Sequence, residues 1–146
     1  MGKIIRGGDL RPDDILLFVQ DSTYDEIFYC PDLDVVSIHN YDKNRAPSDF
    51  DGIIAKAQTY NKRVIMEEFS CDAKQDAGGS RYGRATCNEK EINLYESVGI
   101  PWMYWSVVGI SNDLREVFID DPTWKIFEAH SKGTNRPGKF TWPELY

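Results

Sequence analysis

The chain has 146 residues, of which 41% are hydrophobic and 13% aromatic, and it carries a formal net charge of −7 at pH 7. This length suits a single domain with a hydrophobic core, residues 1–146, and it is too short for two domains of ordinary size. The acidic charge disfavours nucleic acid and anionic membrane surfaces as partners, and no apolar run approaches the roughly 20 residues of a membrane-spanning helix.

The N-terminal part contains one strand and one ambiguous segment. Residues Lys3 to Gly7 predict a short strand, and nothing before or within it has the apolar region of a signal peptide. The segment from Pro12 to Gln20 starts with a proline and two aspartates, which favours a helix, although its apolar run is equally compatible with a strand. We expect a helix there, followed by an aromatic-rich connection of undefined form from Tyr24 to Cys30.

Two further strands and a helix are predicted in the centre of the chain. Asp34 to Tyr41 has the apolar, β-branched composition of a strand. A helix begins near Ser48, with Asp51 three residues later as a capping-box-like pair, and its apolar residues recur at helical spacing. Lys62 to Ser70 then predicts a strand that is buried on both faces, as in a parallel sheet.

The C-terminal half continues the alternation of helices and strands. A polar loop from Cys71 to Cys87 leads into a helix from Asn88 to Gly99, and Ile100 to Val108 predicts the last strand. A final helix begins at Pro122 and ends at Gly133, and the tail from about residue 133 is expected to be irregular. Strands that alternate with amphipathic helices indicate an α/β fold with four parallel strands and flanking helices.

The three cysteines give no metal site. An odd number leaves at least one of Cys30, Cys71 and Cys87 outside any disulfide within the chain. Their spacing matches no zinc pattern, and with two histidines in the sequence we expect neither a metal nor a cofactor. Cys71 and Cys87 bracket a glycine-rich loop, and whether they form a disulfide depends on a compartment that the sequence does not reveal.

Three predicted strand ends carry side chains suited to chemistry, namely His39 and Tyr41, then Glu67 and Glu68, and finally Trp105. The carboxyl ends of parallel strands meet at one edge, where such folds place their active sites. Taken singly, each has an ordinary structural explanation as a salt-bridged or core residue. Together they fit a sugar site, in which a carboxylate attacks, a histidine and a tyrosine orient it, and an aromatic ring stacks on the pyranose.

Three segments carry a resemblance to a known family. Ser37 to Tyr41, Ile65 to Ser70 and Gly99 to Ser106 resemble the sixth, seventh and eighth strands of glycoside hydrolase family 5, which contains cellulases and β-mannanases. Members of that family are (β/α)8 barrels, and the resemblance extends from about residue 3 to about residue 130. It implies that the chain is half of such a barrel, (β/α)4, with the equivalents of strands five to eight.

The resemblance also implies roles for individual residues. Glu68 matches the catalytic nucleophile, His39 and Tyr41 match a His-x-Tyr pair that binds substrate, and Trp105 matches the tryptophan beneath the reacting sugar. The implied partner is a β-linked polysaccharide or oligosaccharide, and the implied location is secreted. The double glutamate before an aromatic residue resembles the mannanase branch, whereas Ser70 stands where the family usually has glycine.

One catalytic group of the family has no counterpart here. Its acid/base glutamate belongs to an Asn-Glu-Pro motif on strand four, and the sequence contains no such motif. Retaining hydrolysis needs two carboxyl groups about 5 to 5.5 Å apart. Glu67 is expected to point away from Glu68, because successive strand residues face opposite sides. We therefore expect the isolated chain to hydrolyse little or no glycan.

Three interpretations of the function remain open from the sequence. The first is the C-terminal half of a retaining β-glycanase that needs a complementary N-terminal half, and the second is a non-catalytic half-barrel that binds carbohydrate or is structural. The third, a flavodoxin-like nucleotide binder, is weaker because Gly7-Gly8-Asp9 is too short and too acidic for a phosphate loop. Since a half-barrel would expose two sheet edges, we expect a homodimer that pairs the strand at Lys3 with the partner's strand at Ile100.

Overall fold

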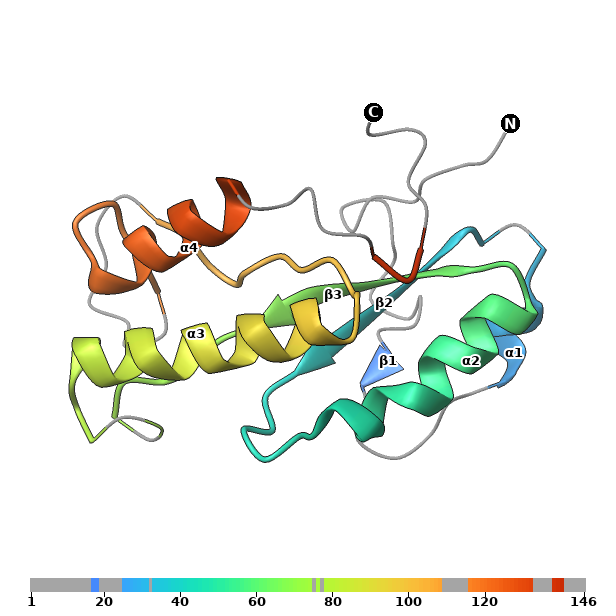
Figure 1. Ribbon diagram of the computed structural model, residues 1–146, viewed down its shortest axis with the longest axis horizontal. Coiled ribbons are helices and arrows are strands. Elements are labelled where there is room, and N and C mark those ends of the chain that lie inside the picture. Colours follow the sequence, from blue (N-terminus) through green and yellow to red (C-terminus); the bar gives the residue numbers. More distant parts are fainter. Residues whose placement is uncertain are drawn as a thin grey trace.

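The computed structural model describes residues 17–18, 25–31, 33–74, 76, 78–108, 116–132 and 138–140. Within these residues the chain is an α/β protein with a parallel sheet and flanking helices, so the predicted fold class is confirmed at that level. Figure 1 shows the helices before and after the third strand extending along the sheet, with the C-terminal helix beside the longest one.

The sheet of the described residues has three parallel strands in the order β1-β2-β3, which are β1 (Leu17–Phe18), β2 (Val35–Asn40) and β3 (Arg63–Phe69). Two predicted strands are confirmed as β2 and β3. The prediction that the second of them is buried on both faces is wrong, because β3 packs on the helices with one face and leaves the other partly exposed. The prediction of a helix from Pro12 to Gln20 is wrong for Leu17 and Phe18, which form β1. Pairing of this apolar run with β2 outweighs the weak helix signals at its start. The strand predicted from Lys3 to Gly7 lies outside the described residues.

The segment predicted as the last strand lies beside β3 without forming a regular strand. Met66 N donates a hydrogen bond to Pro101 O (2.9 Å), and Met103 N donates to Met66 O (2.7 Å). A single parallel bridge joins Met66 to Trp102. The predicted strand from Ile100 to Val108 is therefore not seen as such, and the described part of the chain does not show four strands.

Helices account for most of the remaining described residues. The connection from Tyr24 to Cys30, left undefined by the sequence, contains a helix. The last helix begins at Pro122 as predicted and extends to Lys132, while its predicted end at Gly133 lies outside the described residues. None of the described helices is long and apolar enough to cross a membrane. The helical segments are α1 (Asp25–Tyr29), η1 (Pro47–Phe50), α2 (Asp51–Thr59), α3 (Arg81–Ser97) and α4 (Pro122–Lys132).

The start of the helical segment before β3 differs from the expected capping pair. The 3₁₀ turn begins at Pro47, and the carboxylate of Asp49 accepts a hydrogen bond from Ala46 N (2.8 Å). The predicted pair, Ser48 and Asp51, does not cap the helix. A proline at the first helical position sets the start, because its missing N–H group would have no partner there in any case.

The longest helix, α3, begins well before the predicted position. Its cap is Ser80, whose Oγ accepts a hydrogen bond from Gly83 N (3.2 Å), so the predicted start at Asn88 is wrong. The helix ends where the sequence predicts, at a left-handed glycine: Gly99 has φ = +70°. A Cβ at Gly99 would also lie 2.7 Å from Lys139 N, so both the backbone and the space require glycine.

Apolar side chains fill the space between the sheet and the helices. They alternate along β2 and β3, so that one face of the sheet packs on the inner faces of α2 and α3. Each such burial contributes roughly 1.5–3 kcal/mol relative to exposure. The buried residues are Val36 and Ile38 of β2, Val64, Met66 and Phe69 of β3, Ile53, Ile54 and Ala57 of α2, and Ile92 and Tyr95 of α3.

Candidate functional site

The face of the sheet opposite the helices carries the side chains singled out by the sequence. Along β2, Ile38 and Asn40 are directed to the helices, so the alternation of the strand directs Ser37 and His39 to the other face, followed by Tyr41 at the strand end. His39 is only 7% exposed, whereas Tyr41 is 41% exposed. The two residues therefore line the same face at different depths.

A β-bulge in β3 changes the expected direction of Glu67. Ile38 pairs with Met66, but the next residue of β2, His39, pairs with Glu68, so β3 has one extra residue at this point. The segment that carries Trp105 lies on the other side of β3 and shows the same extra residue. Met66 O accepts a hydrogen bond from Met103 N (2.7 Å), and the next hydrogen bond along this side runs from Trp105 N to Phe69 O (3.3 Å). Two residues along this segment therefore correspond to three along β3.

The bulge brings both glutamates to the site. Met66 and Phe69 are both buried, while the two residues between them are only partly buried. The expectation that Glu67 points away from Glu68 is therefore wrong: strict alternation holds for a regular strand, and this strand is interrupted between Met66 and Phe69.

Five side chains form a continuous polar row across β2 and β3. Ser37 Oγ donates a hydrogen bond to Glu67 Oε2, and the same oxygen lies 3.7 Å from His39 Nε2. On the other side of the ring, His39 Nδ1 lies 3.6 Å from Glu68 Oε2. Tyr41 donates its phenolic hydrogen to Glu68 Oε1. The structure thus brings His39, Tyr41 and Glu68 together, as predicted, and adds Ser37 and Glu67.

Trp105 lies at the same sheet edge. Its backbone N–H donates to the carbonyl of Phe69, the residue after Glu68, and its side chain is 59% exposed. The peptide bond between Trp105 and Ser106 is cis. The exposed ring argues against a core role for Trp105, and its proposed contact with sugar stays a prediction.

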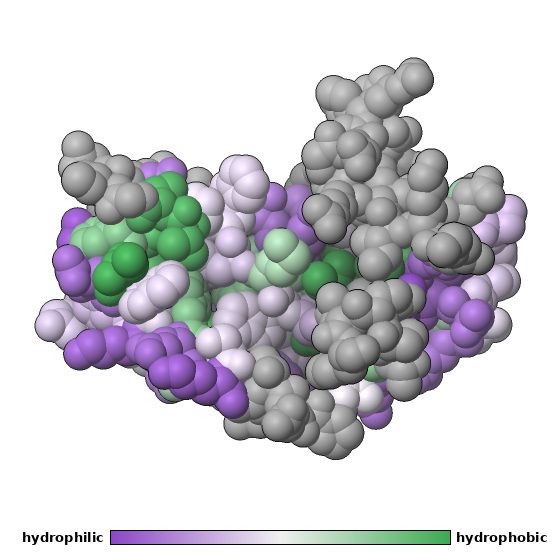
Figure 2. Space-filling model, turned by 90° about the horizontal axis from the view of Figure 1, so that it is seen from above, coloured by the Kyte–Doolittle hydropathy of each residue, from purple (hydrophilic) through white to green (hydrophobic). Residues whose placement is uncertain are grey.

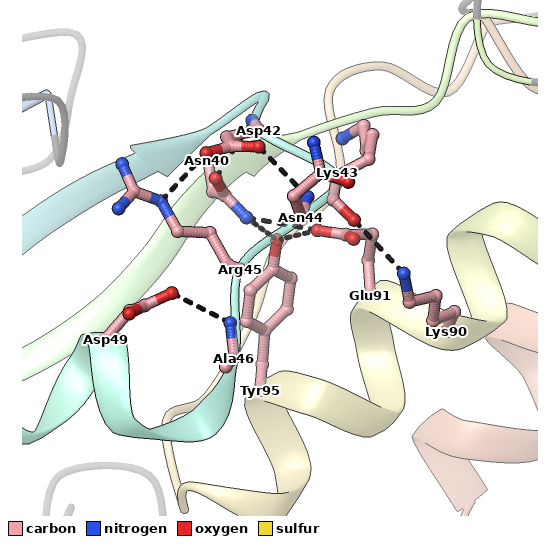
Figure 3. Close-up of polar contacts among 10 residues, drawn as sticks. All are labelled: Asn40, Asp42, Lys43, Asn44, Arg45, Ala46, Asp49, Lys90, Glu91 and Tyr95. Carbon is pink, nitrogen blue, oxygen red and sulfur yellow. Dashed lines mark hydrogen bonds and ion pairs between the residues drawn. The ribbon is translucent and has the colours of Figure 1, made fainter.

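A buried polar cluster on the helix side anchors the end of β2 (Figure 3). Asn40 Nδ2 donates to Glu91 Oε2 (3.0 Å) and to Tyr95 OH (2.9 Å), and Tyr95 OH donates to Glu91 Oε2 (2.7 Å). Burial, and secondarily the charge of Glu91, hold the pKa of Tyr95 well above its usual range. Because Asn40 lies between His39 and Tyr41 in the strand, this cluster fixes the backbone that carries both.

Sequence reasoning missed this cluster. It placed Asn40 in a predicted strand and Glu91 and Tyr95 in a predicted helix, without connecting them. One signal was available: an amide at a strand position that faces the helices requires buried hydrogen-bond partners, and these must come from the helix packed on that strand.

The loop after β2 is also tied in place. Asn40 Oδ1 accepts a hydrogen bond from Asp42 N (3.1 Å), and Asp42 Oδ1 accepts from Asn44 N (2.9 Å). From α3, Lys90 Nζ donates to the carbonyl of Lys43 (3.1 Å). Figure 3 shows the contact of Lys90 spanning the space between the loop and α3. Together they limit where the side chain of Tyr41 can lie.

The end of β3 is fastened to α3 by a disulfide. Cys71 and Cys87, whose pairing the sequence left open, are bridged. Cys71 N also donates to Asn88 Oδ1 (3.0 Å), and Asn88 Nδ2 donates to Tyr104 OH (3.4 Å). Asn88, predicted to begin a helix, instead connects the end of β3, α3 and the segment that carries Trp105.

Metal-binding geometry among the described residues occurs in one place, where Cys71, Asp76 and Cys87 have their ligand atoms close together. The two sulfur atoms form the disulfide and are not available as thiolate ligands. The row from Ser37 to Tyr41 contributes no such group. Its chemistry is that of two partly exposed carboxylates held by neutral donors and a histidine.

Comparison with known proteins supports the fold. Neither a family of known proteins nor a curated protein matches the chain. Among solved structures, the chain is similar to the endo-β-1,4-mannanase from Thermotoga petrophila, with a TM-score of 0.60 and 16% sequence identity over 75% of this chain. The chain spans 28% of the length of that mannanase chain. The described fold thus resembles part of a TIM barrel.

Proposed function

We propose that the chain is the nucleophile-bearing part of a retaining β-1,4-glycanase of the glycoside hydrolase family 5 type, and that its substrate is a β-linked glycan. The observation that supports this most strongly is the setting of Glu68. Its carboxylate lies on the face opposite the helices, with one oxygen hydrogen-bonded by Tyr41 and the other 3.6 Å from His39. Two neighbours thereby fix the direction of a carboxylate whose side chain remains partly exposed.

In this proposal Glu68 attacks the anomeric carbon of the sugar. A bond forms between a carboxylate oxygen and that carbon while the glycosidic C–O bond breaks, and the leaving oxygen takes a proton from a carboxylic acid on the opposite side. Water then cleaves the glycosyl ester. Glu67 does not supply this acid, because Glu67 and Glu68 lie on one strand beside one histidine ring and so approach a sugar from the same side.

The proposed partner that supplies this acid is a complementary half of the barrel. The chain would provide the equivalents of strands five to eight. An N-terminal half would close the sheet and carry the acid, whereas a second copy of the chain would close the sheet without supplying an acid. Supporting this, Met103, Trp105 and Val107 are exposed in alternation with the partly buried Trp102 and Tyr104. Figure 2 shows further apolar surface over the end of the molecule that holds α4.

Calorimetric titration tests the proposal directly. Manno-oligosaccharides and cello-oligosaccharides of equal length should bind the wild-type chain, and the preferred series identifies the glycan. Trp105→Ala should weaken that binding, whereas Tyr82→Ala, which removes an exposed ring from the first turn of α3, should not. No heat of binding with either series would overturn the proposal.

A second candidate function is a carbohydrate-binding protein without chemistry. It is favoured by the exposed rings of Tyr41 and Trp105 together with the missing acid. Reaction with an activated 2-fluoro glycoside separates the two functions, because a good leaving group departs without a proton and a true nucleophile is then trapped as its glycosyl ester.

The oligomeric state is tested by sedimentation equilibrium at micromolar concentration, where a stable monomer would contradict the homodimer.

A further inference from the structure

We infer that Glu67 is a positioning residue, which together with Ser37 holds the His39 ring against Glu68. This inference rests on the proposed function for the identity of Glu68 as the reacting group. The arrangement of Glu67, Ser37 and His39 is itself independent of any glycan.

The first support is the cost of bringing Glu67 to this face. A bulge leaves one residue of a strand without its regular partner on the neighbouring strand. The bulge in β3 lies where it directs a second carboxylate towards β2. A regular strand would have directed Glu67 or Glu68 to the helices, where a carboxylate would need buried partners. The bulge avoids that burial and gives Glu67 two neighbours on the site face, Ser37 and His39.

The second support is the geometry of the histidine ring. His39 is buried, and its two nitrogens face different carboxylates: Nε2 lies 3.7 Å from Glu67 Oε2, and Nδ1 lies 3.6 Å from Glu68 Oε2. Turning the ring over would exchange these nitrogens for carbon atoms and lose both electrostatic contacts. Glu67 therefore selects the ring orientation in which Nδ1 faces Glu68, and it influences which nitrogen carries the proton.

The third support is that Glu67 is itself held. Ser37, two residues before His39 on the same strand, donates a hydrogen bond to the oxygen of Glu67 that faces the ring. This bond restricts the carboxylate to one position. Without Ser37 the carboxylate would be free to rotate away from Nε2, so Ser37 acts on the ring through Glu67.

Other roles for Glu67 fit less well. It is not the acid, because it would approach the sugar from the same side as Glu68. Nor does it belong to the group of metal-ligating side chains found among the described residues. Its contacts lead to His39 and Ser37, and His39 in turn faces Glu68.

The test is nuclear magnetic resonance of the histidine rings in the whole chain without ligand. The sequence contains two histidines, His39 and His130, so a His39→Gln variant assigns every ring ¹⁵N signal. Glu67→Ala should shift both ring ¹⁵N signals of His39 and leave those of His130, which contacts Glu96 on α3, unchanged. Glu89→Ala, which removes an exposed glutamate of α3, is the matched control and should change neither.

Two further variants make the result decisive. Glu67→Gln should restore the His39 signals in part, because its amide oxygen still accepts a hydrogen bond from Ser37. Ser37→Ala should shift them in the same direction as Glu67→Ala but less, and it serves as the test if Glu67→Ala does not fold. Unchanged His39 signals in a folded Glu67→Ala or Ser37→Ala variant overturn the inference, even if the variant is less stable.

The rate of trapping by the activated 2-fluoro glycoside gives the second readout. Glu67→Ala should slow the labelling of Glu68 at least about tenfold, within the roughly 10²-fold cost of a misplaced catalytic group. Wild-type labelling speed in Glu67→Ala overturns the inference and leaves the proposed function standing. A wild-type chain that takes no label contradicts the proposed function, and the ring signals then decide the role of Glu67 alone.

Discussion

The two faces of the sheet hold their side chains by different physical means. The face towards the helices is mainly apolar and closed: Val64, Met66 and Phe69 have no exposed surface, and the polar cluster of Asn40 is buried. The opposite face is polar and partly open, and its side chains contact one another through hydrogen bonds and charges rather than through packing. Stability is therefore concentrated on the first face and candidate chemistry on the second.

The two faces meet at the bulge in β3. Met66 and Phe69 both turn inward, and the packing of these two side chains fixes the strand on either side of the extra residue. Glu67 and Glu68 can then be directed to the open face without any packing of their own. A substitution on the closed face should therefore lower stability, and one on the open face should change ligand contacts and leave stability nearly unaltered.

The largest expected loss of stability comes from Phe69→Ala. The Phe69 ring is fully buried and makes edge-to-face contacts with Tyr95 (5.0 Å between centroids), Tyr104 (5.4 Å) and Trp102 (5.9 Å). We expect a loss of about 3–5 kcal/mol in the free energy of unfolding, measured by urea denaturation. Tyr82→Ala, on an exposed ring, is the control and should cost little. A loss below about 1 kcal/mol for Phe69→Ala would contradict the contrast between the faces.

Removal of the disulfide should have the next largest effect. Cys71 and Cys87 are 16 residues apart, and closure of a loop of this size stabilises a protein by about 3 kcal/mol. We expect the double variant Cys71→Ser, Cys87→Ser to lose that amount in urea denaturation. Cys30→Ser, at the free and exposed cysteine, should leave the unfolding curve unchanged. Equal stability of the double variant and the wild type would show that the bridge does not hold β3 against α3.

Tyr95→Phe probes the polar cluster within the closed face. The hydroxyl group is buried and bonded to Asn40 and Glu91, so its removal should lower the free energy of unfolding by about 1 kcal/mol at neutral pH. Urea denaturation of both proteins measures the difference. A variant as stable as the wild type would mean that the cluster does not stabilise the end of β2.

The same variant predicts a difference at alkaline pH. The folded state raises the pKa of Tyr95, so the folded chain keeps this proton while the unfolded chain releases it above about pH 10. Stability should therefore fall as the pH rises, by up to about 1.4 kcal/mol per pH unit from this group. Tyr95→Phe lacks that contribution, and its stability should fall less steeply between about pH 9 and 11. Identical slopes would contradict the raised pKa.

The smallest expected change in stability is at Trp105. Because its ring is largely exposed, Trp105→Ala should alter the free energy of unfolding by no more than about 0.5 kcal/mol while weakening glycan binding by about 1 kcal/mol. Trp102→Ala is the matched control from the closed face. Its ring packs against Phe69 and Phe127, and its loss should cost about 3 kcal/mol or more of stability. Equal losses of stability in the two variants would remove the distinction.

Much of this arrangement follows from the sequence. The apolar runs of β2 and β3 and the polar residues after them predict that His39, Tyr41 and Glu68 meet at one edge. Local composition decides these elements, because a strand buried on one face needs apolar side chains at alternate positions. The end of α3 at Gly99 is equally local, since a left-handed residue is required there.

The rest depends on contacts between distant segments. Two adjacent glutamates are compatible with a regular strand or with a bulge. The bulge is set by the pairing of β3 with β2 on one side and with the backbone of Trp105 on the other. The strand β1 forms because its residues pair with the edge of β2, and the local sequence does not show that this edge is available. Asn88 looks like a helix cap until the disulfide brings Cys71 beside it.

The central claim is that Glu68, the second residue of the pair and not the first, is a nucleophile on the open face. Mass spectrometry of the chain after reaction with activated 2-fluoro β-mannoside and β-glucoside tests it most directly, with peptide mapping of the modified residue. We predict one sugar per chain, attached to Glu68, still formed by Glu67→Gln and absent from Glu68→Gln. Attachment to Glu67, or the same modification in Glu68→Gln, would contradict the account.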